Sequence, residues 1–116
     1  MWKNLAPNLL RQRVIIEGTT EKIVKPDKIK AYLFALSKVA KMKVLDDPFI
    51  CTTHEMGYAG YIHWTTSGTH FYSYHTNPPL FTVDIYTCKG FSVKNTIDST
   101  KGFLAPIKLV WKEIKV

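Results

Sequence analysis

Two adjoining strand-like runs in the middle of the chain constrain the fold most. Residues 81–87, FTVDIYT, alternate apolar and polar positions, as a strand with one buried face does. Residues 70–76, HFYSYHT, are rich in strand-favouring aromatic residues, and the turn residues 77–79, NPP, separate the two runs. The segment therefore predicts a hairpin, which can bring the imidazole of His75 and the thiol of Cys88 to one site.

Two helices are expected around this hairpin. Lys25-Pro26-Asp27 is a typical helix start, and apolar residues then recur at intervals of three and four, which predicts an amphipathic helix over Pro26–Met42. A weaker pattern predicts a second helix over Ser92–Phe103. A tight turn is expected at Thr66-Ser67-Gly68. Further strands are expected at 13–18, at 43–45 with continuation over 49–53, at 61–65 and at 107–116.

This order of elements predicts an α+β domain over residues 13–116, preceded by an N-terminal arm over residues 1–12. The expected architecture is a single-layer, mainly antiparallel sheet with two helices on one face. The strands carry more aromatic surface than one sheet face needs, including Trp64, Tyr72 and Trp111. We therefore expect the other face to be covered in a homodimer, sheet against sheet.

Composition narrows the class of protein. A chain of 116 residues is one domain, and it contains no apolar run long enough to cross a membrane. The N-terminal sequence lacks a secretory signal, so we expect a cytoplasmic protein with Cys51 and Cys88 reduced. The net charge is +7, and seven of the 16 basic residues are lysines dispersed in or beside the first expected helix, which indicates a solvated helix face and no nucleic-acid partner.

Several residues are candidates for chemistry, and each has a plain structural alternative. His75 is either a histidine satisfied at a strand end or an acid–base group, and Cys88 is either a small buried residue or a reactive thiol. Ser67-Gly68-Thr69 is either a simple turn or a strained site at which a hydroxyl attacks the preceding carbonyl. Metal-ligand spacing such as CxxC or HExxH is absent, so no zinc site is expected from the histidines at 54, 63, 70 and 75.

Several segments of the chain resemble a known protein family. The run HTNPPLFTVDIYTCKGF is similar to a segment of the small prokaryotic S-adenosylmethionine decarboxylases that reads roughly HTWPE and then AAVDVFTCG. Four shorter segments, RVIIEG, AKMKVLDD, GYAGYIHW and WKEIKV, resemble other parts of that family in the same order. The resemblance covers most of the chain from Arg13 to Val116, and the HT and YTC motifs are its most specific part.

The resemblance implies a definite chemistry. Family members cut themselves before a serine, which becomes a pyruvoyl group, and this carbonyl forms a Schiff base with the amine of S-adenosylmethionine. By motif match, His75 would assist the self-processing and Cys88 would return a proton to the product. Phe49 roughly matches an aromatic residue that stacks on the substrate adenine. The implied enzyme is a carboxy-lyase of polyamine (spermidine) biosynthesis.

The chain departs from the family at the cleavage site. The family cleaves between Glu and Ser, and no Glu-Ser pair occurs here. Counting forward from GYAG places the family serine on Ser67, whereas the family's Ser-His pair matches Thr69 and His70. Ala59 stands where the family has a serine that helps processing. Either Ser67 or Thr69 is therefore the expected precursor of the pyruvoyl group.

The departure leaves alternatives open. The chain can be an unprocessed homologue that binds S-adenosylmethionine or regulates a partner. It can also be a pyruvoyl decarboxylase that acts on arginine or ornithine, or an α+β module without catalysis.

Overall fold

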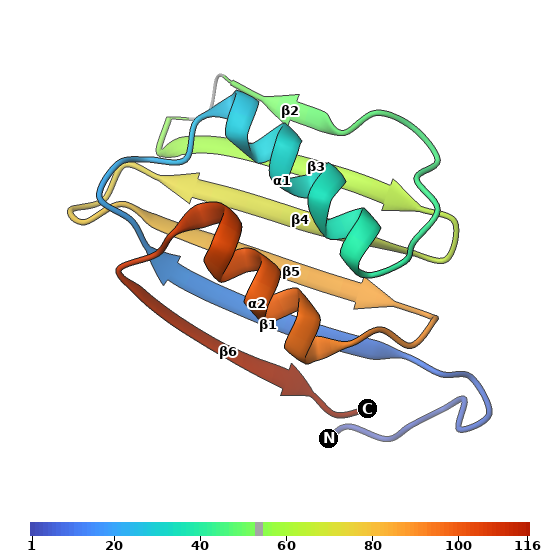
Figure 1. Cartoon of the computed structure of the whole chain (residues 1–116). Coiled ribbons are helices and arrows are strands. Elements are labelled where there is room, and N and C mark those ends of the chain that lie inside the picture. The colour runs from blue at the N-terminus through green and yellow to red at the C-terminus, as the bar shows by residue number, and fades with distance from the viewer. Residues whose placement is uncertain (53–54) are drawn as a thin grey trace.

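A computed structural model describes residues 1–52 and 55–116. Within them the chain forms a sheet with two helices packed against it (Figure 1). The elements in chain order are β1 (Gln12–Thr19), α1 (Pro26–Val39), β2 (Phe49–Cys51), β3 (Gly57–Trp64), β4 (Ser67–Tyr74), β5 (Leu80–Thr87), α2 (Val93–Leu104) and β6 (Lys108–Ile114).

The sheet has six strands in the order β2-β3-β4-β5-β1-β6, and each neighbouring pair is antiparallel. Both helices lie on the same side of the sheet, which leaves the other side without a helix (Figure 1). The expected α+β architecture is therefore confirmed. The first strand lies between β5 and β6, so the two ends of the chain meet at one edge of the sheet.

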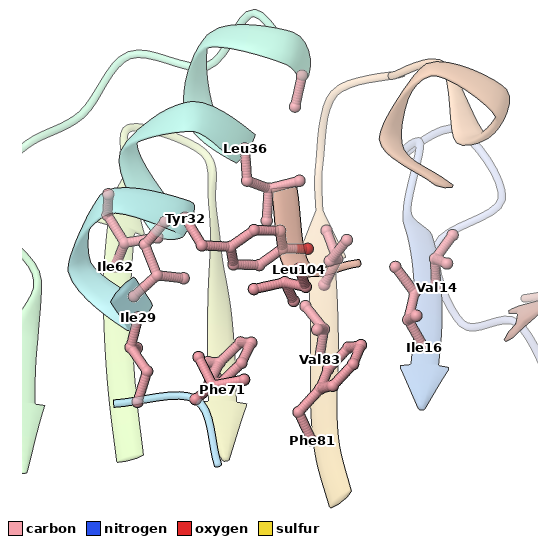
Figure 2. Packing of buried hydrophobic residues seen from close by; sticks show 14 of the residues in the cluster. Val14, Ile16, Ile29, Tyr32, Leu36, Ile62, Phe71, Phe81, Val83 and Leu104 are labelled. Atoms are coloured by element: carbon pink, nitrogen blue, oxygen red, sulfur yellow. The ribbon is translucent and has the colours of Figure 1, made fainter. Parts of the chain in front are cut away.

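The core forms between the helices and one face of the sheet. Figure 2 shows Ile29, Tyr32 and Leu36 of α1 directed toward Phe71 and Val83 of the sheet, and all five residues are buried. The Tyr32 hydroxyl lies 2.8 Å from the Thr100 hydroxyl of α2, which joins the two helices inside the core. Burial raises the pKa of Tyr32 well above its usual value, so this phenol stays neutral.

The first helix begins where the sequence predicts but ends three residues earlier, at Val39. Lys41 has a φ of 57°, in the left-handed region, and its N–H donates to the carbonyl of Lys38. The N–H of Met42 donates to the carbonyl of Ser37, which completes a Schellman-type helix end. The second helix begins as expected, because the Ser92 hydroxyl accepts a hydrogen bond from the N–H of Asn95.

The predicted turn at Thr66-Ser67-Gly68 and the predicted strand at 43–45 need correction. The turn between β3 and β4 consists of Thr65 and Thr66, so Ser67 and Gly68 already belong to β4. No strand forms at 43–45, where Val44 makes a single bridge to Trp64. The residues after it, Asp-Asp-Pro, disfavour strand pairing. Of the strand expected at 49–53, the described residues form the three-residue β2, and residue 53 lies outside the described part of the chain.

A buried hydrogen bond between α1 and β3 gives a test of this packing. The Trp64 indole N–H donates to the Ser37 hydroxyl at 2.7 Å, and both residues are buried. Ser37→Ala would leave this N–H without an acceptor, so we expect a loss of about 1–3 kcal/mol in the free energy of unfolding, measured by urea denaturation. Lys38→Ala, at an exposed neighbour, should change it by less than about 0.5 kcal/mol. An equal effect of both substitutions would contradict this assignment.

Candidate functional site

The end of the β4–β5 pair brings Ser67 next to Cys88. Ser67 pairs with Thr87, and the N–H of Cys88 reaches both the Thr66 carbonyl oxygen, at 3.3 Å, and the Ser67 Oγ, at 3.2 Å. The Thr66 Oγ1 lies 3.1 Å from the Ser67 Oγ. A hydroxyl, the carbonyl of the preceding residue and a main-chain donor therefore converge at one peptide bond.

The tight turn explains this convergence. Trp64 and Ser67 pair across the turn, so Thr65 and Thr66 alone reverse the chain. Ser67 is 9% exposed and shares the helix-covered face of the sheet with Phe71, whereas Thr66 is exposed at the turn. The peptide bond between Thr66 and Ser67 thus lies at the boundary between solvent and core.

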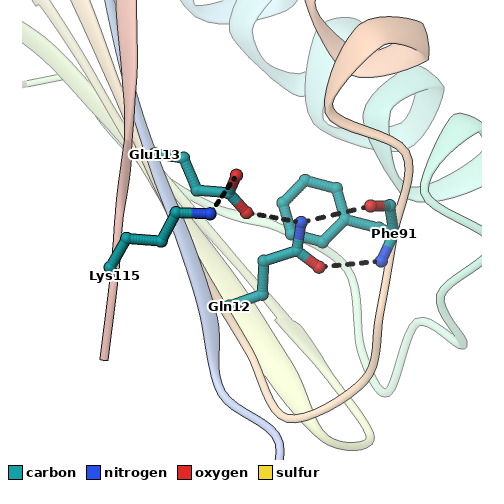
Figure 3. A network of polar contacts seen from close by, with 4 residues as sticks. All are labelled: Gln12, Phe91, Glu113 and Lys115. Carbon is teal, nitrogen blue, oxygen red and sulfur yellow. Dashed lines mark hydrogen bonds and ion pairs between the residues drawn. The ribbon is translucent and has the colours of Figure 1, made fainter.

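The loop that follows Cys88 is held by a polar network at the start of β1 (Figure 3). The Gln12 side chain accepts from the Phe91 N–H at 3.1 Å and donates to the Phe91 carbonyl at 3.2 Å and to the Glu113 carboxylate at 3.0 Å. Glu113 lies 3.7 Å from the Lys115 ammonium group. The Thr87 hydroxyl donates to the Gln12 carbonyl at 3.2 Å, so both sides of Cys88 are fixed to β1.

His75 lies at the other end of the same hairpin. Tyr74 pairs with Leu80 at that end, and the strands pair over eight residues, so at about 3.3 Å per residue His75 and Cys88 are on the order of 25 Å apart. The expectation that the hairpin joins them within one chain is therefore wrong. His75 is exposed, and its ring contacts the Tyr58 ring with centroids 5.5 Å apart.

Thr69, the alternative precursor, lies inside the sheet. It pairs with Ile62 on β3 and Ile85 on β5 and is 1% exposed on the helix-covered face. Its hydroxyl has no hydrogen-bond partner among the described residues. The peptide bond before Thr69 belongs to a strand paired on both sides, and it is not part of the turn.

A hollow of about 450 Å³ opens on the uncovered face of the sheet beside Ser67. Gly68 forms part of its lining, and a Cβ at this position would lie 2.6 Å from the Tyr61 hydroxyl. The missing side chain therefore makes room for the hollow. Its other lining residues are Arg13, Tyr61, His63, Thr66, Ser67, His70, Asp84 and Tyr86.

An aromatic row crosses the sheet beside this hollow. Phe49, which is 72% exposed on β2, pairs with Tyr61, and Tyr61 pairs with His70 with ring centroids 4.4 Å apart. His63 pairs with Gly68, so His63 and His70 do not oppose each other directly but line the same hollow. The row places the substrate-binding candidate Phe49 next to a wall of the hollow.

A charged pair forms the opposite wall. The Arg13 guanidinium donates two hydrogen bonds to the Asp84 carboxylate, at 3.1 and 2.8 Å, and these raise the pKa of Arg13. The two side chains are 43% and 38% exposed, so solvent limits the contribution of the pair to stability. Sequence reasoning missed both residues. The only signal is opposite charge on two strands, and it becomes meaningful once β1 is known to lie beside β5.

Other parts of the described chain offer less for catalysis. A larger hollow, about 1030 Å³, lies between the loop after β1 and the end of α2 and is lined mainly by lysine and aliphatic side chains. Among residues 1–52 and 55–116, no group of three or more His, Cys, Asp or Glu side chains could hold a metal ion. His54, one of the four histidines considered above, lies outside the described residues.

No helix within the described ranges is long and apolar enough to cross a membrane.

The fold and the site define a class of α+β proteins in which a serine next to a tight turn adjoins a cysteine just after the end of the neighbouring strand. The sequence profile of the S-adenosylmethionine decarboxylase family matches residues 14–115, and the chain belongs to this family. The predicted family is thus confirmed. A search of curated proteins found no match.

A solved structure agrees with this assignment. The crystal structure of the adenosylmethionine decarboxylase from Aquifex aeolicus is similar to this chain, with a TM-score of 0.70. The likeness covers 91% of this chain and 89% of that chain at 19% sequence identity. At this identity the likeness concerns the fold, so the roles of individual residues must be argued from their own geometry.

Proposed function

We propose that the chain is a pyruvoyl-dependent S-adenosylmethionine decarboxylase of spermidine biosynthesis, acting in the cytoplasm, which cuts itself between Thr66 and Ser67. One observation carries the proposal: the Ser67 hydroxyl and the Thr66 carbonyl share the Cys88 N–H, at 3.2 and 3.3 Å. This contact favours Ser67 over Thr69, because Ser67 directly follows the turn whereas Thr69 lies two residues further into the strand.

The self-cleavage requires only residues of the chain and water. The Ser67 Oγ attacks the Thr66 carbonyl carbon, the peptide C–N bond breaks, and the resulting ester leaves a free amine on residue 67. Loss of the Cα proton then breaks the Cβ–O bond, which gives a Thr66 carboxylate and a dehydroalanine at residue 67. Tautomerisation and hydrolysis release ammonia and leave a pyruvoyl group on the fragment 67–116.

A carbonyl at residue 67 would supply the electron sink for loss of carbon dioxide from an amino acid. The hollow beside Ser67 fits such a substrate. Phe49 and Tyr61 provide aromatic faces on which an adenine ring or a sulfonium cation can stack. The Arg13 guanidinium and the Asp84 carboxylate provide a positive and a negative group for the carboxylate and the amine of the substrate. Cys88 lies at the same end of the sheet, and its side chain is the proposed donor of a proton to the carbon that lost the carboxylate.

His75 takes part through a second copy of the chain. The sheet face without helices carries exposed or half-buried aromatic residues, including Phe49, Tyr72 and Tyr86, which a homodimer would cover. Two sheets packed face to face with their strands reversed would bring the strand end that carries His75 in one copy to the strand end that carries Ser67 in the other. The separation of His75 from Cys88 within one chain supports this arrangement, because a site with both residues then needs two chains.

An unprocessed homologue that binds S-adenosylmethionine or regulates a partner is the second candidate. The burial of Ser67, at 9% exposure in a paired strand, favours it. Self-cleavage separates the two candidates directly.

The first prediction concerns cleavage. Purified protein should appear on a denaturing gel as fragments 1–66 and 67–116, because the turn exposes the scissile bond to attack by Ser67. Ser67→Ala should remain one intact chain, whereas Thr69→Val, which removes the alternative hydroxyl, should still be cut. An intact wild-type chain would defeat the pyruvoyl mechanism and favour the unprocessed homologue.

The second prediction concerns turnover. Cys88→Ala should be cut normally, but its release of carbon dioxide from carboxyl-labelled S-adenosylmethionine should fall by about 10²–10⁴-fold because the proton donor is lost. Cys51→Ala is the matched control and should keep its activity. Labelled arginine and ornithine are measured in parallel, and preference for either would replace the proposed substrate. Full turnover by Cys88→Ala would remove the proton-donor role.

The third prediction tests the two-chain site. His75→Ala alone should be cut at least about tenfold more slowly than wild type. Co-expression with a differently tagged Ser67→Ala chain should restore cutting of the His75→Ala chain, because the mixed dimer supplies one intact His75. If co-expression restores nothing, or if His75→Ala is cut at the wild-type rate, His75 does not act across a dimer.

A further inference from the structure

We infer that two groups not assigned above drive the self-cleavage: the Thr66 side-chain hydroxyl, which orients Ser67 and relays its proton, and the Cys88 main-chain N–H, which stabilises the oxyanion. The inference rests on the proposed self-cleavage at Ser67. Thr66, the residue before the cleaved bond, thereby has a positioning role in addition to forming the turn.

The Thr66 hydroxyl links the buried nucleophile to solvent. The Ser67 Oγ is buried and accepts a hydrogen bond from the Cys88 N–H, so its own proton is free to point to the Thr66 Oγ1, 3.1 Å away. Thr66 itself is exposed. Its hydroxyl can therefore accept the Ser67 proton while passing its own proton to water, which a buried serine cannot do directly.

The Cys88 N–H lies where the negative charge develops. It is shared between the Ser67 Oγ, at 3.2 Å, and the Thr66 carbonyl oxygen, at 3.3 Å. When the Oγ attacks, charge moves from the hydroxyl to the carbonyl oxygen, and the hydrogen bond to that oxygen becomes charge-assisted and stronger. The donor is held in place by the Ser67–Thr87 pairing and by the bond from Thr87 to Gln12, so it is oriented before the reaction begins.

The step balances within this set of groups. The bond from the Ser67 Oγ to the Thr66 carbonyl carbon forms as the hydroxyl proton leaves through the Thr66 Oγ1 to solvent. The carbonyl π electrons move to oxygen, which the Cys88 N–H stabilises. The oxyanion then re-forms the C=O bond, the C–N bond breaks, and the nitrogen of residue 67 takes a proton from solvent. No oxidant, reductant or other reactant is required.

The neighbouring threonine provides a matched control. The Thr65 hydroxyl is exposed and lies 3.4 Å from the Lys43 carbonyl oxygen, so it is directed away from Ser67. Thr65→Val and Thr66→Val remove the same group from adjacent turn positions. Of these two hydroxyls, the one on Thr66 contacts the Ser67 Oγ and the one on Thr65 contacts the Lys43 carbonyl instead.

The test follows cleavage of freshly refolded protein on denaturing gels. Thr66→Val should slow cutting at least about tenfold, Thr66→Ser should restore it to within about threefold of wild type, and Thr65→Val should leave it unchanged. To compare uncut chains, each of the three substitutions is also combined with Ser67→Ala, and these double variants should unfold at the same urea concentration as Ser67→Ala alone. If Thr66→Val is cut at the wild-type rate, the relay is overturned while the proposed function stands; if wild type is not cut, both fail.

Added hydroxylamine identifies the step. Hydroxylamine cleaves an ester without waiting for elimination, so it cuts any chain that has completed the shift from nitrogen to oxygen. Thr66→Val should remain slow in hydroxylamine, because the shift itself is impaired. A Thr66→Val chain that hydroxylamine cuts at the wild-type rate would place Thr66 after the shift and overturn the inference.

The main-chain donor needs a backbone change. Incorporation of lactic acid at position 88 replaces the N–H by an ester oxygen, and Cys88→Ala, which has the same side chain and keeps the N–H, is its control. Loss of the donor should slow cutting by about 10²-fold relative to Cys88→Ala. Equal rates for the two chains would remove the Cys88 N–H from the mechanism.

Discussion

The antiparallel pairing of β4 with β5 determines which functional groups can meet. Because Ser67 pairs with Thr87, the residue after each strand end is fixed: Cys88 adjoins the β3–β4 turn, and His75 lies at the far end of the ladder. A shift of this register by one residue would turn every side chain of β4 to the other face of the sheet. Core packing of Phe71 against Tyr32 of α1 therefore also positions Ser67, the proposed nucleophile.

The two faces of the sheet have different tasks. The helix-covered face holds the core, and Ser67 lies at its edge, where the Thr65–Thr66 turn meets solvent. The uncovered face carries the hollow over Gly68 and the aromatic residues around it. In the proposed dimer this second face is both the interface and the substrate site, so assembly and activity depend on the same surface.

Local pattern was sufficient for most of the fold. The alternation of residues 81–87 and the start of α1 at Pro26 were both predictable, because each depends on neighbours in sequence. The end of α1 was not, since Lys41 adopts a left-handed conformation that usually marks a glycine. The Arg13–Asp84 pair could not be predicted for another reason. The two residues are 71 positions apart in sequence, and only the strand order brings them together.

The family resemblance made Cys88 and His75 candidate site residues but could not choose between Ser67 and Thr69, because that choice depends on which peptide bond lies in the turn. The central claim is that Ser67 becomes a carbonyl group, and the intact mass of the C-terminal fragment tests it most directly. The account predicts that the mass of fragment 67–116 is lower, by the mass of one ammonia molecule, than the mass calculated for the unmodified peptide 67–116. A fragment with an unmodified serine, or one that begins at residue 69, would contradict it.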